Sequence, residues 1–554
     1  MLTRRAALAL ALGVVSIITT SVVFLSTNSV PPLRQVVGRD VRAPRDPAAP
    51  LQFRSDGSFQ IAIFEDLHFG ENAWTHWGPQ QDLSTVRVME AVLDAEQPDL
   101  VVLNGDLITG ENAFRENSTV YVDQIVAPMV HRAVPWASTY GNHDSDFNLS
   151  RADLLAREQQ LLPRGLARTA NMLSNPGPGD VRRAGVTNYY LPVYGTDCAP
   201  GNDKDMANHC VPQLVLWFFD SRGGFLYQQK DGTTDQRVGQ ENWVDDSVVA
   251  WFEQTQAELE TTYRTVIPAL AFVHIPPNVA YALQMNTAPG SKGRNGSGDS
   301  VDPHRQPGIN DDKPLAQQAE GWCPDGAQSG CAYGGQDESF MRAIAAAGNG
   351  TGIVALFVGH DHGDTWCHTW AAGDTLPGVD IPGTGVHVCF GQHTGYGGYG
   401  TWTRGGRQVR VTEESLRQAG LAASSPTNHR PAVDTWIRLE TGDVVGNVSL
   451  NATYGRDVYP STPNTHTHCP TCDTIDASET ESVRKRPSVW TGGSRWGSVL
   501  GSASKSGSAG KAGMVVEAVV PAAADDIQRP KLHVQQTQHK HRGWRRYVRW
   551  PAAV

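Results

Sequence analysis

Short apolar runs alternate with helix-like segments through the first third of the chain. The runs at 59–64, 99–103 and 135–140 are almost continuously apolar, which predicts strands that are buried on both faces. Between them, apolar residues recur at helical spacing over 83–95 and 120–130. This order of elements predicts an α/β architecture, in which the loops that follow successive strands meet at one edge of a sheet.

The pattern continues with less regular spacing to about residue 450. Further helices are predicted at 152–162, 245–262 and 340–347. Further strands are predicted at 189–193, 213–220, 266–273, 352–356, 385–390, 408–412, 435–439 and 444–450. A polar, glycine-rich stretch at 287–335 is longer than most loops of compact domains, and we expect it to be functional or disordered.

Several of the predicted strands end at side chains that commonly bind metals. In chain order these are Asp66 and His68, then Asp106, then Asn142, His143 and Asp144, then His274, and finally His360 and His362. Each group alone has a simpler explanation, because a lone aspartate commonly caps a helix and a lone histidine is commonly a core or surface residue. Imidazole nitrogens and carboxylate oxygens that all follow strands together predict a metal site.

The same residues form the motifs D-x-H, G-D, G-N-H-D, H and G-H-x-H, in that order. In these motifs the chain resembles the calcineurin-like metallophosphoesterase superfamily, over about residues 57–455. Within the superfamily it is similar to fungal secreted or membrane-anchored phosphatases and to the short, atypical purple acid phosphatases of plants. The resemblance implies a four-layer α/β/β/α sandwich with a metal site at the strand ends.

The resemblance also implies a role for each of these residues. Asp106 would bridge two metal ions, the first held by Asp66, His68 and His362 and the second by Asn142, His274 and His360. His143 would protonate the leaving group or hold a phosphate oxygen, and Asp144 would orient His143. Typical purple acid phosphatases have an iron-binding tyrosine three residues after the bridging aspartate, where this chain has Thr109. We therefore expect a colourless enzyme. Its metals could be iron, manganese or zinc.

These features predict a dinuclear-metal-dependent hydrolase of phosphoric esters, in which a hydroxide that bridges the metals is the nucleophile. A phosphomonoesterase is favoured. The alternatives are a phosphodiesterase or nucleotide pyrophosphatase that uses the same site, and a non-catalytic binding protein on this scaffold, which the intact ligand set disfavours. His393 in a late loop is a candidate contact for the phosphorylated substrate, as are Arg222, His304 and Arg305.

The two ends of the chain have a different character from its middle. Two arginines precede an apolar run at 6–25, which predicts a signal peptide or a single-pass signal anchor within 1–30. A linker is expected at 31–56, and a disordered tail with a basic, aromatic end at 456–554. The formal net charge of −11 argues against nucleic-acid binding.

The cysteines and the glycosylation motifs favour the secretory pathway. Eight cysteines fall in close pairs that could each close a local loop: Cys198 and Cys210, Cys323 and Cys331, Cys367 and Cys389, Cys469 and Cys472. N-x-S/T sequons stand at Asn117, Asn148, Asn295, Asn349, Asn447 and Asn451. With the predicted signal segment, they predict a disulfide-bonded protein that carries N-glycans and is secreted or anchored to a membrane.

Overall fold

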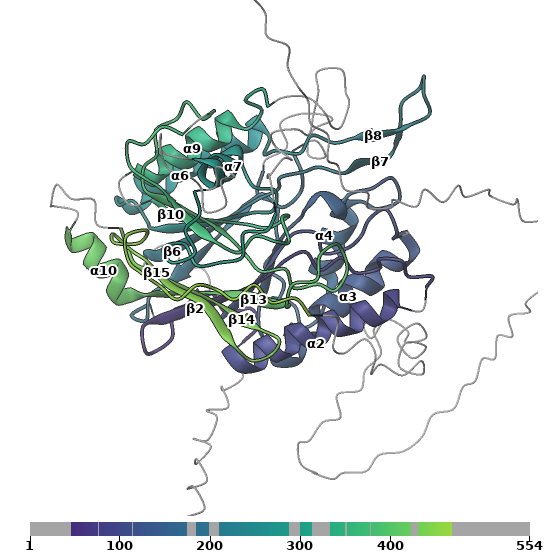
Figure 1. The fold of residues 1–554 in the computed structure, drawn as a ribbon, viewed down its shortest axis with the longest axis horizontal. Helices are drawn as coiled ribbons and strands as arrows, with labels where there is room; N and C mark the ends of the chain where they lie inside the picture. Colours follow the sequence, from purple (N-terminus) through teal and green to yellow (C-terminus); the bar gives the residue numbers. More distant parts are fainter. Residues whose placement is uncertain are drawn as a thin grey trace, which may run out of the picture. The chain divides into compact units, whose positions relative to one another are not determined.

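Two β-sheets pack face to face, and helices cover the outer surface of each sheet (Figure 1). The computed structural model describes residues 46–467 apart from 76, 114, 174–183, 199–209, 287–299, 313–332, 350–351, 377 and 423–429. The predicted signal segment and most of the predicted tail therefore lie outside the described residues. Among the helices that are described, none has the length and apolar character needed to cross a membrane.

The first sheet contains six described strands in the order β15-β14-β13-β2-β3-β4. Its strands are β2 (Ser58–Phe64), β3 (Leu100–Asn104), β4 (Trp136–Thr139), β13 (Gly405–Thr412), β14 (Val433–Leu439) and β15 (Val444–Leu450). β2, β3 and β4 are parallel, so their carboxyl ends lie at one edge of the sheet.

The second sheet contains seven described strands in the order β1-β5-β6-β9-β10-β12-β11. Its strands are β1 (Leu51–Gln52), β5 (Tyr189–Tyr194), β6 (Pro212–Phe219), β9 (Ala269–Val273), β10 (Ile353–Val358), β11 (Cys367–Trp370) and β12 (Val386–Phe390). The central strands β6, β9, β10 and β12 are parallel to one another, which again gathers their carboxyl ends at one edge.

Three buried apolar clusters hold the layers together, one between the sheets and one beneath each helical layer. The helices on the first sheet are α2 (Gly78–Glu96), α3 (Arg115–Arg132) and α4 (Arg151–Gln160). Those on the second sheet are α6 (Asp246–Tyr263), α7 (Asn278–Met285) and α9 (Glu338–Gly348). The expected four-layer α/β/β/α sandwich is confirmed.

β2 explains why the predicted strands lack an alternating pattern. Phe59, Ile61 and Ile63 point into the cluster between the sheets, whereas Ala62 and Phe64 belong to the cluster beneath the helices. Both faces of the strand are thus buried, and a continuous apolar run is the result.

Some elements were not predicted from the sequence. They are the short strands β1 and β11, the helices α7 and α10 (Glu413–Ala422), and the hairpin of β7 (Phe225–Lys230) and β8 (Arg237–Gly239), which projects from the body of the domain in Figure 1. β1 corrects the predicted linker at 31–56, because Leu51 pairs with Val193 of β5. A two-residue strand is too short to produce a detectable period, and it exists only because β5 offers an edge.

The predicted disordered tail begins too early. Residues 456–467 lie against the domain, where the Tyr459 N–H donates to the carbonyl of His304 over 2.8 Å. The Thr467 N–H donates to the carbonyl of Thr401 over the same distance. Backbone hydrogen bonds to distant loops order this polar segment, and its composition gives no sign of them.

Two of the expected cysteine pairs are disulfides, Cys198–Cys210 and Cys367–Cys389. The second joins the neighbouring strands β11 and β12, in which the two residues are directly paired. Cys323, Cys331, Cys469 and Cys472 lie outside the described residues.

Arg407 of β13 connects the two sheets. Its side chain is 1% exposed and donates to the carbonyl of Phe390 at the end of β12, to the carbonyl of Thr365, and to the Thr435 hydroxyl, over 2.6 to 2.8 Å. Phe390 is the last residue of β12, and Thr365 lies in the loop between β10 and β11, so both acceptors belong to the second sheet and its loops. This guanidinium therefore fixes the distance between the sheets near the edge where β10 and β12 end.

We expect Arg407→Met to lower the free energy of unfolding by about 3 to 5 kcal/mol, because three buried acceptors lose a charged donor. Denaturant unfolding followed by circular dichroism would measure the change. Arg410→Met is the matched control on the same strand. Arg410 is half-exposed and pairs with Asp434 at 3.0 Å, so its loss should cost less than about 1 kcal/mol. Equal losses in the two variants would contradict the connecting role of Arg407.

Candidate metal centre

Five strand ends from both sheets deliver the predicted ligands to one place. Asp66 and His68 follow β2, Asp106 follows β3, and Asn142 and His143 follow β4. From the second sheet, His274 follows β9, and His360 and His362 follow β10. Because the sheets are stacked with these ends at a common edge, loops that are hundreds of residues apart become neighbours.

The backbone at these strand ends adopts the left-handed region at several non-glycine residues. The φ angles are 54° at Asp66, 49° at His68, 49° at Asp106 and 76° at His360. Such residues cost about 1–2 kcal/mol each, although aspartate and histidine tolerate the region better than most. At His360 the left-handed backbone turns the chain between the two histidines of the G-H-x-H motif.

Two positions in the motifs require glycine, because other side chains lie too close to the backbone there for a Cβ. A Cβ at Gly105 would lie 2.4 Å from the His274 ring, and a Cβ at Gly141 would lie 2.3 Å from Oδ1 of Asp106. Gly105 also has a φ of 89°, which favours glycine. Any side chain at these positions would occupy the space in which the donor groups meet.

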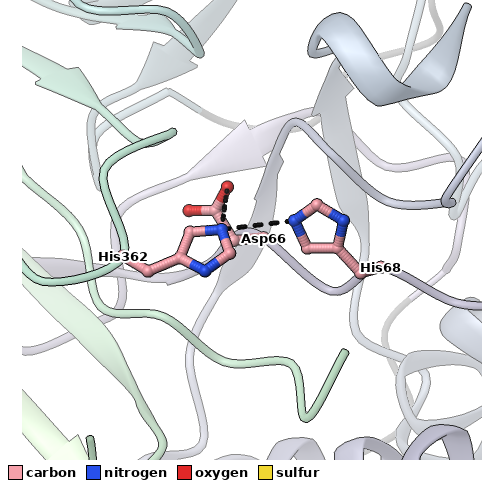
Figure 2. Close-up of side chains that lie close together, drawn as sticks. All are labelled: Asp66, His68 and His362. Atoms are coloured by element: carbon pink, nitrogen blue, oxygen red, sulfur yellow. Dashed lines mark hydrogen bonds and ion pairs between the residues drawn. The ribbon is translucent and has the colours of Figure 1, made fainter. Parts of the chain in front are cut away.

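Asp66, His68 and His362 form the first of three clusters of possible metal donors. In Figure 2, dashed lines join one nitrogen of the His362 ring to Asp66 and to His68. Nε2 of His362 lies 3.2 Å from Nε2 of His68 and 3.5 Å from Oδ1 of Asp66. Three potential lone-pair donors thus face a common point.

Asp106 belongs to both of the other clusters. One contains His68 and His143, and the other contains His274 and His360. Oδ2 of Asp106 lies 3.1 Å from Nε2 of His274 and 3.9 Å from Nε2 of His68. This carboxylate therefore lies near both histidine groups, and His362 and His360 belong to different clusters.

Hydrogen-bond partners at Nδ1 fix the tautomer and the orientation of two imidazole rings. Nδ1 of His274 faces the carbonyl of Asn104 at 2.8 Å, and Nδ1 of His362 faces the carbonyl of Tyr399 at 2.8 Å. A carbonyl only accepts, so both Nδ1 atoms carry the proton, and in a neutral ring Nε2 then offers a lone pair. Nδ1 of His68 lies 3.4 Å from the hydroxyl of Thr109, the residue that replaces the expected tyrosine.

Several inward-facing atoms are buried without a hydrogen-bond partner among the described residues. They are Oδ1 of Asp66, Oδ1 of Asn142, Nε2 of His274 and Nδ1 of His360. Buried polar atoms are normally paired, because an unpaired one costs about 1–3 kcal/mol. Oxygen and imidazole donors that converge in this way fit a pair of metal ions, each of which would satisfy several of them at once.

His143 has a partner that the sequence did not predict. Nδ1 of His143 lies 2.9 Å from Oε2 of Glu111, in the loop after β3. Burial by itself would lower the pKa of His143, but the negative charges of Asp106 and Glu111 outweigh it and raise this pKa to about 9. The pair is thus a charged imidazolium and carboxylate. Nothing in the spacing of Glu111 from the other motifs indicates this contact.

Asp144 does not orient His143, which corrects the expectation. One carboxylate oxygen accepts the N–H groups of Leu107 and Ile108 at 2.9 and 3.0 Å, and the other accepts the N–H of Gly141 at 2.8 Å. Asp144 therefore joins the loop after β3 to the loop after β4. Its side chain is fully buried and points away from the substrate side of the site.

Four other candidate substrate contacts do not line the site: His393, Arg222, His304 and Arg305. His393 is 1% exposed, and its ring packs behind that of His362 at a centroid distance of 3.8 Å. Arg222 is buried and binds the carbonyl of Trp243 and the carboxylate of Asp245. His304 and Arg305 hold the 455–459 segment instead.

A cavity of about 540 Å³ opens above the donor groups. Its walls carry the carboxylates of Glu71 and Glu111, the amides of Asn112 and Asn142, and the ring of Tyr399. No lysine or arginine is among the described residues that line it. Among the described side chains that line the cavity, only histidines such as His143 could carry a positive charge.

Comparison with known proteins agrees with this geometry. Residues 59–278 match the family model of the calcineurin-like phosphoesterases. The chain contains a calcineurin-like phosphoesterase domain. "Probable inactive purple acid phosphatase 28" of Arabidopsis thaliana is 27% identical over 413 residues, which cover 72% of this chain and 85% of the plant protein.

Two further similarities are more limited. Phosphatase DCR2 of Saccharomyces cerevisiae is 28% identical over 249 residues, which cover 44% of this chain and 39% of the yeast protein. A solved dimetal phosphatase from Danio rerio is 14% identical with a TM-score of 0.38, and the match covers 71% of this chain and 98% of that one.

We expect the calcineurin-like phosphoesterase domain to be purified with about two metal ions per chain, and Asp106→Ala to lose most of both, because this carboxylate lies near both donor groups. Elemental analysis of the protein would measure the content. His304→Ala is the control, since this exposed histidine lies away from the cavity, and it should keep the metals. Full metal content in Asp106→Ala would contradict a shared carboxylate.

Proposed function

We propose that this protein is a dinuclear metal-dependent phosphomonoesterase. The observation that carries the proposal is the convergence of six histidine and aspartate donors, with Asn142 lining the same cavity, and several of their buried atoms have no hydrogen-bond partner among the described residues. Asp66, His68 and His362 would hold the first ion, and Asn142, His274 and His360 the second, with Asp106 shared between them. The metals would supply a water of lowered pKa and a positively charged clamp for the phosphate oxygens.

His143 is the residue that would complete the reaction. It lines the cavity beside His68, with ring centroids 4.9 Å apart, and its side chain is 33% exposed. Hydrolysis adds water to phosphorus and breaks the P–O bond to the alcohol, so that the departing oxygen needs a proton. A protonated His143 that is paired with Glu111 can donate this proton, or hold a phosphate oxygen while charge builds up on it.

The charge of the cavity supports a monoester over a nucleotide pyrophosphatase. Each additional phosphate of a polyphosphate substrate adds negative charge that cations or hydrogen-bond donors must offset. The described walls offer the carboxylates of Glu71 and Glu111 and no lysine or arginine. A single phosphate group, bound by the metals and His143, suits this cavity better.

The word "inactive" in the names of the plant relatives makes activity the first thing to test. The donor set supports an intact site over a degenerate one, because each of the seven expected side chains is present in the sequence and six of them fall in the clusters of possible metal donors. Two disulfides in the described domain further support folding in an oxidising compartment such as the secretory pathway.

The decisive experiment compares hydrolysis of an aryl phosphate monoester with that of the matching diester, on protein of known metal content. We expect turnover of the monoester that is lost on chelation and restored by added metal. His143→Ala should keep its metals and lose activity by about 10²–10⁴-fold, because it removes the proton donor. Metal-loaded protein that hydrolyses neither ester would overturn the proposal, and a preference for the diester would favour the alternative.

The two carboxylates near His143 should behave differently on substitution. Glu111→Gln keeps a hydrogen-bonding group but removes the charge, so we expect turnover to fall about tenfold with unchanged stability and metal content. Asp144→Asn places an amide where three N–H groups need an acceptor, so it should cost about 2 kcal/mol of stability and also weaken metal binding. Thermal unfolding, elemental analysis and kcat distinguish the two roles. Loss of stability in Glu111→Gln would instead indicate a structural residue.

A further inference from the structure

One wall of the cavity is acidic, and it is the wall beside His68 and His143. Glu71 accepts the backbone N–H of Gly398. Gly398 itself is packed against the metal-site histidines, since a Cβ there would lie 2.5 Å from the His362 ring and 2.8 Å from the His68 ring. Glu111 lies on the same side through its 2.9 Å contact with His143.

The two glutamates are close enough to repel each other. Burial and the charge of Glu111 raise the pKa of Glu71, whereas the Gly398 N–H and the charges of His143 and His362 lower it. His143 is paired with Glu111, and the described walls of the cavity contain no lysine or arginine that could pair with Glu71. The arginine that the sequence suggested for this purpose, Arg222, is buried in contacts with Trp243 and Asp245. A positively charged ligand group would relieve this excess of negative charge.

Aromatic rings border the same space. Tyr399 stacks on the His362 ring with a centroid distance of 4.0 Å and is 49% exposed. Its ring lines the cavity together with Phe225 of β7. Aromatic faces attract ammonium groups, and the attraction adds to that of nearby carboxylates.

From this geometry we propose that the preferred substrates are phosphomonoesters of amino alcohols, whose ammonium group occupies the acidic wall at Glu71. The inference rests on the phosphomonoesterase activity proposed above. If His143 protonates the departing oxygen, the alcohol leaves on the side of His143, which is also the side of Glu71 and Glu111. The phosphate binds the metals, the P–O bond to the alcohol breaks, and the products are inorganic phosphate and an alcohol that still carries its ammonium group.

Phosphonates test the recognition without any chemical step, because their P–C bond is not hydrolysed. Aminopropylphosphonate, butylphosphonate and phosphonobutyrate present a positive, a neutral and a negative group at similar distances from phosphorus. We expect their inhibition constants against an aryl phosphate monoester to rise in that order on the metal-loaded protein, with about a tenfold difference between the first two. The preference should shrink as salt is added.

Glu71→Gln should reduce the ratio of the inhibition constants of butylphosphonate and aminopropylphosphonate toward one, and Glu71→Lys should invert it. Glu253→Gln is the matched control, because it removes the same charge from the exposed surface of α6. It should leave the ratio and the basal activity unchanged. An equal loss of the ratio in Glu253→Gln would indicate a general effect of net charge and would overturn the role of Glu71.

The outcomes separate this inference from the proposed function. A wild-type protein that hydrolyses aryl monoesters but binds the three phosphonates equally, or binds the negative one best, overturns the amino-alcohol inference and leaves the phosphomonoesterase intact. Metal-loaded protein without any hydrolysis overturns both. Direct kinetics with phosphoethanolamine and propyl phosphate then extend the test to turnover, where a kcat/KM advantage for the amine that Glu71→Gln removes is the expected result.

Discussion

Seven donor side chains point toward one another at a buried edge of the sandwich, and this arrangement is unfavourable unless cations lie among them. In neutral rings, lone pairs of Nε2 atoms would face carboxylate oxygens at 3 to 4 Å, and several of these atoms have no other described partner. Repulsion of this kind would open the loops if nothing held them. Much of the surrounding structure serves to hold these loops in place.

Three kinds of restraint act on the strand ends. Glycines at 105 and 141 let the loops approach within contact of the donor groups. Backbone carbonyls of Asn104 and Tyr399 orient the histidine rings from behind. The Asp144 carboxylate then joins the loops after β3 and β4 through three N–H groups, so that donors from different strands share one rigid base.

Arginine has a structural part in this domain. Arg151 of α4 donates to the carbonyls of Gly141 and Arg222, which joins the loop after β4 to the loop after β6. Arg407 joins the two sheets from within. Because these guanidinium groups are committed to backbone carbonyls, the cavity keeps a wall of carboxylates beside a centre built for cations. Under the proposed function, the charge that binds phosphate would therefore come from the metal ions and His143.

The sequence alone determined most of the strands, the ordered donor motifs and hence the type of site. Continuous apolar runs predicted strands buried on both faces, and five of the predicted strands ended at a donor. The sequence could not determine which carboxylate contacts His143. Glu111 reaches it through the course of one loop, whereas Asp144, its neighbour in the chain, is turned away by the N–H groups of another loop. The charge of the cavity was equally hidden, because Arg222 follows a strand end but is buried elsewhere. Periodicity reports which faces are buried, and only the packing of loops from distant strands decides which polar groups meet.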